Sequence, residues 1–177
     1  MSVDETKAKR EFEKVLELKQ DYAFSYFQLA LYDMKDKKYS EAIKKYNSAI
    51  RYDNKVALFY NSLAAAYLYA KDEQGALGTL ETGLSRMEDD SLSYNYALLL
   101  LKYKPQEKGK IITYFERAER LKPDDYDYHL ALGAMYLENK KYLAARSQYE
   151  KAIKIKPDDL ISQLAIVTTY CRTGGIS

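Results

Sequence analysis

Residues Tyr126–Asp159 read YDYHLALGAMYLENKKYLAARSQYEKAIKIKPDD, and they contain the pattern that decides the fold. Apolar and small residues recur three and four positions apart over 128–139 and again over 143–155. This spacing is the period of one face of an α-helix. Pro157 ends the second segment, because proline fixes φ and disfavours helical geometry in the residue before it. The stretch therefore predicts two helices joined by a short polar turn.

The same pattern recurs about every 34 residues along the chain. A two-helix unit of this kind cannot bury its apolar face alone, but stacked neighbours bury a continuous core together. The positions that carry the recurrence are the sets Tyr26, Tyr60, Tyr94 and His129; Ala42, Ala76, Ile111 and Ala145; Tyr46, Leu80, Phe115 and Tyr149; and Ala49, Gly83, Ala118 and Ala152.

This spacing resembles the tetratricopeptide repeat. That family has an aromatic residue, Leu-Gly and Tyr in the first helix of each repeat (helix A), and Ala, an aromatic residue and Ala in the second (helix B). The resemblance implies an all-α fold, a right-handed superhelix (α-solenoid) of antiparallel helix pairs. Departures are local. The Gly of helix A is replaced by Ala30, Ala64 and Leu98 in the other repeats, and its Tyr is replaced by Asp33 in the first.

We expect one repeat array over residues 1–177. In the second repeat, Gly75, Gly78 and Gly83 weaken helix B by roughly 1 kcal/mol each relative to alanine. That helix should be the least stable of the array. The expected parts are a lone helix B (1–22), repeats 23–56, 57–90, 91–125 and 126–159, a capping helix (160–172) and a tail (173–177).

The composition excludes several classes of protein. The formal net charge of +2 is too small to indicate a nucleic-acid partner. The single cysteine, Cys171, excludes an internal disulfide framework and a metal site of several cysteines. The sequence has no apolar run of membrane-spanning length and no hydrophobic segment after its first charges. We therefore predict a cytoplasmic protein, or a piece of a longer one, with no cofactor and no metal.

Catalytic chemistry is not expected either, because the sequence shows no constellation of acid, base and nucleophile. The only histidine, His129, occupies a slot that is tyrosine in the other repeats, which favours a packing role. The carboxylate pairs beside the repeat boundaries are interpreted as helix-start or turn residues rather than general acids. These pairs are Asp89 and Asp90, Asp124 and Asp125, and Asp158 and Asp159.

A binding surface is predicted on the side of each helix A that is not used for stacking. In the tetratricopeptide family this side lines a concave groove that holds a peptide or helix. Here it is unusually apolar, and exposed apolar patches usually mark a contact site. Asn61 and Asn95 recur one repeat apart, and their amides suit a peptide backbone. The predicted peptide-binding residues are Phe27, Leu31, Asn61, Leu68, Tyr69, Asn95, Tyr96, Leu99, Tyr103 and Leu130.

The preferred interpretation is an interaction adaptor that binds an apolar segment or an amphipathic helix of a partner protein in this groove. Two alternatives remain open at this point. One is a scaffold that forms homo-oligomers through the two array ends, where the first helix B has no helix A and the last helix is apolar. The other is a regulatory module of a larger enzyme.

Overall fold

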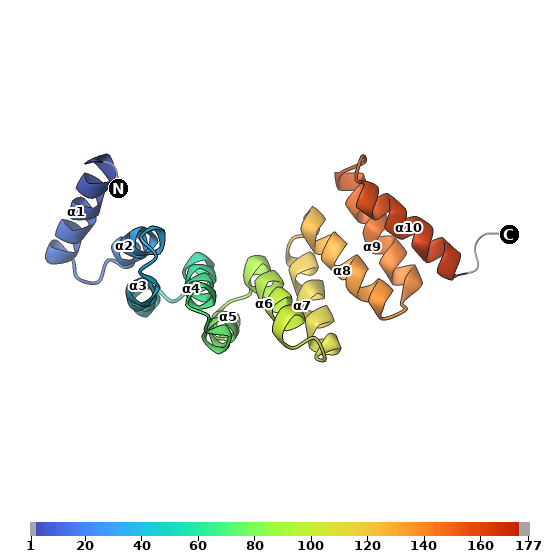
Figure 1. Cartoon of the computed structure of the whole chain (residues 1–177), viewed down its shortest axis with the longest axis horizontal. Coiled ribbons are helices and arrows are strands. Elements are labelled where there is room, and N and C mark those ends of the chain that lie inside the picture. The colour runs from blue at the N-terminus through green and yellow to red at the C-terminus, as the bar shows by residue number, and fades with distance from the viewer. Residues whose placement is uncertain (1–2, 174–177) are drawn as a thin grey trace. The chain divides into compact units, whose positions relative to one another are not determined.

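The structure is a computed structural model that describes residues 3–173, and the regular secondary structure of that part is helical (Figure 1). The expected all-α fold is confirmed. Residues 174–177 of the predicted tail lie outside the described residues. The helices are α1 (Val3–Leu18), α2 (Ala23–Lys35), α3 (Tyr39–Tyr52), α4 (Ala57–Tyr69), α5 (Glu73–Arg86), α6 (Asp90–Tyr103), α7 (Lys108–Leu121), α8 (Tyr126–Glu138), α9 (Tyr142–Ile155) and α10 (Leu160–Arg172).

The chain divides into two compact units, residues 1–95 and 96–177, and the boundary falls within α6. In the first unit α1 packs on α2, α2 on α3, α3 on α4 and α4 on α5. In the second unit α7, α8, α9 and α10 pack on one another in the same consecutive order. Within each unit, the largest contacts are therefore between helices that follow one another in sequence, as the repeat pattern predicts. The single array over the whole chain stays a prediction.

The core of the first unit is built from aromatic and alanine residues on α2, α3 and α4. The ring of Phe27 lies 5.0 Å from that of Phe59 and 5.8 Å from that of Tyr46, centroid to centroid. Around these rings the alanines have little or no exposed surface, so neighbouring helices approach closely. The buried core residues are Phe27, Ala30, Ala42, Tyr46, Ala49, Phe59, Leu63 and Ala66.

The second unit shows why a helix pair needs a small residue opposite an aromatic ring. A Cβ atom built on Gly133 of α8 would lie 3.0 Å from the ring of Tyr149 on α9. That distance is shorter than ordinary carbon–carbon contacts, so the ring occupies the space that a side chain at position 133 would need. The Leu132-Gly133 pair of this repeat thus sets the separation of α8 and α9, and Leu132 itself is fully buried beside it.

The turns from helix A to helix B have a common geometry in three repeats. Lys37, Lys71 and Lys140 have φ near +60°, in the left-handed region that is favourable mainly for glycine. In the first of these turns the N–H of Lys37 donates to the carbonyl of Met34, and the N–H of Lys38 donates to that of Asp33. This pair of bonds ends a helix in a Schellman motif, and it reverses the chain within three residues.

Aspartates at the repeat boundaries cap the following helices, as the sequence indicated. The Asp125 carboxylate accepts from the N–H of Asp127, and that of Asp159 accepts from the N–H of Ser162 at 2.7 Å. The Asp89 carboxylate accepts from the N–H of Leu92 at 2.9 Å. Each carboxylate satisfies a helix N–H that has no partner within its own helix. The interpretation of these residues as helix-start residues is therefore confirmed.

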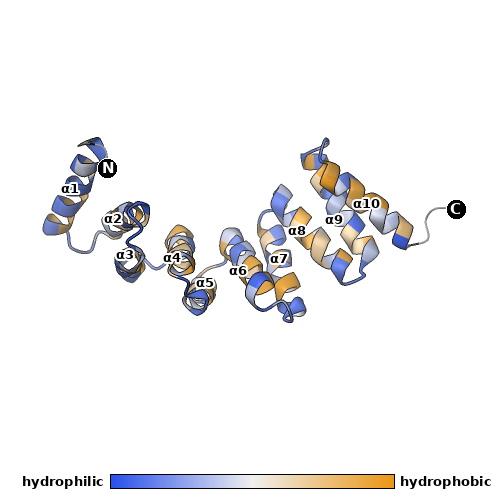
Figure 2. Ribbon diagram, in the orientation of Figure 1, coloured by the Kyte–Doolittle hydropathy of each residue, from blue (hydrophilic) through white to orange (hydrophobic). Residues whose placement is uncertain are grey.

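The first and last helices differ in hydropathy. Figure 2 shows α1 mostly in hydrophilic colours, whereas α10 carries several hydrophobic turns. The charges of α1 include ion pairs within the helix and to α2, such as Lys14 with Glu11 and Lys35 with Glu5. On α10, by contrast, apolar side chains are exposed to solvent, among them Leu160, Ile161, Leu164 and Val167. No helix among the described residues combines the length and apolar character needed to cross a membrane.

The glycines of α5 provide a stability test. A Cβ atom at Gly78 would meet nothing within 4 Å, whereas one at Gly75 would lie 2.6 Å from the Tyr67 ring and 2.7 Å from the Asp72 carboxylate. We expect Gly78→Ala to raise the free energy of opening α5 by roughly 1 kcal/mol, because alanine restricts the unfolded chain. The matched variant Gly75→Ala should lower it. Hydrogen exchange of the α5 amides measures both, and an unchanged or lower protection in Gly78→Ala contradicts the expectation.

A second test uses pH. Burial raises the pKa of Tyr46 to about 12, while an unfolded tyrosine ionises near pH 10. Between about pH 10 and 12 the unfolded chain has lost a proton that the folded chain retains, so stability falls as pH rises. The loss of stability should be smaller in Tyr46→Phe, which lacks the ionising hydroxyl but keeps the ring. Phenylalanine is compatible with this position, since Phe115 occupies it in the third repeat. Urea titrations at fixed pH measure this loss. The exposed-ring control Tyr69→Phe should follow the unchanged chain, and identical falls in all three proteins would refute the assignment.

Candidate functional site

The exposed side of the A helices in the first unit is the candidate binding surface, which we call the helix-A face. It is formed by α2, α4 and the part of α6 up to Asn95. Large apolar side chains remain in contact with solvent on it, the most exposed being Tyr69 at 63% and Leu58 at 54%. Its residues are Phe24, Gln28 and Leu31 on α2, Leu58, Asn61, Ala65, Leu68 and Tyr69 on α4, and Ser91 and Asn95 on α6.

Several predicted residues of the first unit lie on this face. Leu31 and Tyr69 are exposed, and Asn61, Leu68 and Asn95 are half-buried. The expected exposure of Phe27 is wrong, since only 4% of it contacts solvent. Its ring packs against Phe59, because helix A of one repeat also contacts helix A of the next. This contact buries residues at the edge of the predicted binding surface. Phe27 therefore belongs to the core.

The predicted residues of the second unit are mostly covered. Tyr96 and Leu99 are 2% and 9% exposed, so their expected exposure is also wrong. The Tyr96 ring lies edge-on to that of Tyr114, 4.8 Å away, with the Lys110 ammonium 5.1 Å from its centroid. Contacts with the following helix B thus bury this ring. Tyr103 and Leu130 are half-buried. A role for either of these two in peptide binding stays a prediction.

The two amides predicted to hold a peptide backbone are hydrogen-bonded to each other. The Asn95 side-chain N–H donates to the Asn61 side-chain oxygen at 2.9 Å, and the Asn61 N–H donates to the Ser91 hydroxyl at 2.9 Å. Ser91 in turn donates to the Asp89 carboxylate at 2.6 Å. A primary amide offers two donor hydrogens and two acceptor positions, so each asparagine keeps hydrogen-bonding capacity beyond these bonds. The series holds both amides in fixed orientations between α4 and α6.

One end of the helix-A face opens into a pocket that we call the aromatic pocket. It lies between the start of α2, the end of α3 and the start of α4, has a volume of about 380 Å³, and is lined mainly by apolar atoms. The sequence analysis missed it. A signal was present in the tyrosines at positions 22 and 52, next to two consecutive boundaries between repeats. The lining residues are Asp21, Tyr22, Ala23, Phe24, Tyr52, Asp53, Val56, Leu58 and Phe59.

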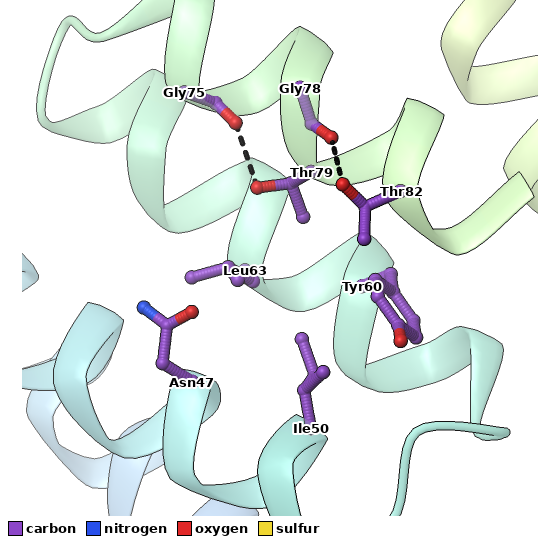
Figure 3. Close-up of a pocket in the computed structure, with 8 residues that line it drawn as sticks. All are labelled: Asn47, Ile50, Tyr60, Leu63, Gly75, Gly78, Thr79 and Thr82. Atoms are coloured by element: carbon purple, nitrogen blue, oxygen red, sulfur yellow. Dashed lines mark hydrogen bonds between the residues drawn. The ribbon is translucent and has the colours of Figure 1, made fainter. Parts of the chain in front are cut away.

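A second cavity, of about 340 Å³, lies between α3, α4 and α5 (Figure 3). Asn47, Ile50, Tyr60 and Leu63 face two glycines and two threonines of α5 there. The threonine hydroxyls donate to carbonyls of their own helix, at 2.7 Å in each case, so the threonines present methyl groups without a free donor (Figure 3). The lining residues of α5 are Gly75, Gly78, Thr79 and Thr82.

At the equivalent positions of the second unit, longer polar side chains bond to one another or to His129. There Thr79 and Thr82 are replaced by Gln148 and Lys151, and Ile50 by Glu119. The Gln148 oxygen lies 2.8 Å from a ring nitrogen of His129, and the Lys151 ammonium bonds the Glu119 carboxylate at 2.6 Å. The cavity of the first unit thus lies where two threonines replace the longer Gln148 and Lys151 of the second unit.

His129 is buried within the helix packing and lies near hydrogen-bond partners at both ring nitrogens. It is 1% exposed, and its other ring nitrogen lies 2.7 Å from the carbonyl oxygen of Pro123. Both nitrogens are therefore engaged within the fold, which agrees with the predicted packing role. Among residues 3–173, no group of three or more His, Cys, Asp or Glu side chains is arranged to hold a metal ion.

Repeated pairs of helices without strands define the described part of the chain as a helical repeat protein. A family model described as tetratricopeptide repeat matches residues 112–159, which comprise most of α7 together with α8 and α9. The predicted resemblance to the tetratricopeptide repeat is confirmed by this match and by the structural neighbours below. The comparison with curated protein sequences finds no match.

The solved structures that resemble this chain have the tetratricopeptide-repeat fold. YrrB, described as a TPR protein with an unusual peptide-binding site, is 20% identical with a TM-score of 0.76, over 94% of this chain and 85% of that one. MamA is 19% identical with a TM-score of 0.69, over 89% and 96%. PilF of Pseudomonas aeruginosa is 19% identical with a TM-score of 0.76, over 97% and 78%. At these identities the likeness is one of fold.

Proposed function

We propose that this chain binds a peptide or an amphipathic helix of a partner protein on the helix-A face of its first unit. Tetratricopeptide-repeat folds serve as protein–protein interaction modules. The observation that carries the proposal is the set of large apolar side chains left exposed on both α2 and α4. They are Phe24, Leu31, Leu58 and Tyr69.

The physical basis is the removal of apolar surface from water. Burying such side chains against a partner is favourable in proportion to the area covered. Around them, the bonded series of Asn61, Ser91 and Asn95 supplies polar groups whose positions are already set. A site with preset polar groups loses less freedom on binding than a mobile one. Apolar contacts would thus supply most of the affinity, while the amides would select the register of the partner's backbone.

The neighbours support the proposal indirectly. YrrB, which shares the fold, is described as having a peptide-binding site. We further propose that the chain is not an enzyme, since both ring nitrogens of His129 are engaged within the fold and Asp89, Asp125 and Asp159 cap helices. A cytoplasmic location stays a prediction from the sequence.

The helix-A face is tested by Leu31→Ser and Tyr69→Ser. We expect either change to weaken capture of the partner by about 5- to 30-fold, the usual cost of truncating a central apolar contact. Helical circular dichroism should be unchanged, because both side chains are exposed. The chain serves as bait for cell extract, and the captured partner is then titrated with each variant.

A control variant shows whether a loss of capture is specific to the helix-A face. Leu18→Ser removes an equally apolar side chain at the end of α1, 90% exposed and outside the helix-A face, and should bind normally. Leu99→Ala is unsuitable as a probe, because Leu99 is buried and its loss would damage the fold. Normal capture by both Leu31→Ser and Tyr69→Ser would rule the face out.

A second candidate function, self-assembly, is favoured by one observation on α10. The offset of 34 residues between α8 and α10 aligns Leu130 and Gly133 with Leu164 and Val167. Leu130 is half-buried and Gly133 is buried, whereas Leu164 and Val167 are 68% and 54% exposed. Exposed apolar residues one helical turn apart provide a surface on which a helix of a second copy can pack.

Self-assembly predicts a mass that depends on concentration. We expect light scattering to show association as the concentration of the chain increases, and Leu164→Glu to abolish it, since a charge in that contact would be desolvated. Ser177, at the far end of the sequence, offers a control site, and Ser177→Glu should associate normally. A constant monomer mass up to millimolar concentration removes this candidate.

A further inference from the structure

The aromatic pocket combines partly exposed rings with carboxylates, and the carboxylates take no part in the proposed apolar contact. Three rings around it, those of Tyr22, Phe24 and Tyr52, are 40–45% exposed, while Phe59 is buried and closes the inner side. Aromatic faces carry a negative partial charge, so rings left open to solvent around one volume attract a cation.

Two carboxylates line the same pocket. Asp21 precedes α2 and Asp53 follows α3, and both are exposed. One oxygen of Asp53 accepts the N–H of Lys55 at 3.1 Å, which orients the carboxylate and leaves its second oxygen for another donor. The lining contains no lysine or arginine. The charged groups of the lining itself are therefore the two carboxylates, which favour a guest with a positive charge.

Cations of the chain itself already lie over two of these rings from outside the lining. The Lys19 ammonium is 5.6 Å from the Tyr22 centroid, and the Arg51 guanidinium carbon is 5.8 Å from that of Tyr52. Both cationic residues are exposed. Positive groups can therefore approach these two rings. Both cation-to-centroid distances are long, so a cation inside the pocket could lie closer to the rings.

We propose that the aromatic pocket binds the guanidinium group of an arginine side chain supplied by the partner segment. A guanidinium is planar, stacks on aromatic faces and pairs with carboxylates through two parallel N–H bonds. A lysine ammonium is more strongly hydrated and does not stack in this way. The volume of about 380 Å³ lies near the lower end of ligand pockets, which suits one long side chain rather than a whole cofactor.

The location connects this inference to the proposed function, on which it rests. Phe24 and Leu58 belong both to the helix-A face and to the lining of the pocket. A segment on that face would thus reach the pocket with a side chain from one of its ends. The partner is then an apolar segment with an arginine near the end that lies beside the start of α2 and α4.

The test uses a probe that needs no knowledge of the partner. The isotope-labelled chain is titrated with N-acetyl-arginine amide and, separately, with N-acetyl-citrulline amide, which has the same shape but no charge. We expect amide NMR shifts concentrated at residues 21–24 and 52–59, saturating at millimolar arginine probe. The citrulline probe should bind at least about fivefold more weakly, as expected for the loss of a cation–π contact and an ion pair.

Matched variants locate the effect. Asp53→Asn keeps the oxygen that accepts from Lys55 but removes the charge, and it should weaken the arginine probe about fivefold or more. Tyr52→Ala should do the same, although the loss of its stacking on Tyr26 makes a check of folding necessary. Asp36→Asn, at the other end of α2, is the control and should bind the probe normally.

The outcomes separate this inference from the proposed function. Equal binding of the two probes, shifts elsewhere on the chain, or no shifts overturn the arginine site. If Leu31→Ser and Tyr69→Ser still abolish partner capture, the helix-A face survives that result. If those variants capture normally while the arginine probe binds as expected, the pocket stands as an arginine site and the helix-A face is wrong.

Discussion

The contact between a small residue on one helix and an aromatic ring on the next sets the spacing on which the rest of this structure depends. Gly133 against Tyr149 is the clearest case, because the ring occupies the position of any added side chain. In the first unit, a Cβ atom built on Gly83 would likewise lie 3.0 Å from the Tyr60 ring. Helices held this close bury alanine and aromatic side chains together, which is how short helices of 13 or 14 residues become stable.

The same constraint decides what is left for binding. Where consecutive A helices approach each other, the side chains between them enter the core, as Phe27 does. Leu31, one turn along α2 from Phe27, and Leu58, next to Phe59 on α4, stay 40% and 54% exposed. The hydrogen-bonded series from Asn95 to Asp89 crosses the same surface. The helix-A face is therefore a by-product of the packing beneath it, apolar at its exposed positions and polar where α4 meets α6.

Differences between repeats account for the cavities. The repeats share their core positions but not the residues at their edges. The first unit has a cavity beside Thr79 and Thr82, whereas the second unit has the longer, hydrogen-bonded Gln148 and Lys151 at these positions. Likewise, the aromatic pocket exists where tyrosines and aspartates flank two successive boundaries between repeats. Such variation leaves the fold intact because core packing and helix caps, rather than edge residues, determine stability.

The helices, their order and the core positions that recur from repeat to repeat could be predicted from the sequence. These features follow from local spacing: a helical period, turn residues at the ends, and alanine or aromatic residues one repeat apart. The sequence also indicated the capping aspartates. Which residues of the apolar stripe are exposed could not be predicted in this way, since Phe27 and Tyr96 pack against residues distant in sequence. The tertiary structure also paired Asn61 with Asn95 and grouped Tyr22 with Tyr52. Helical spacing gives the direction of a side chain from its own helix, whereas its burial depends on what the neighbouring helices place opposite it.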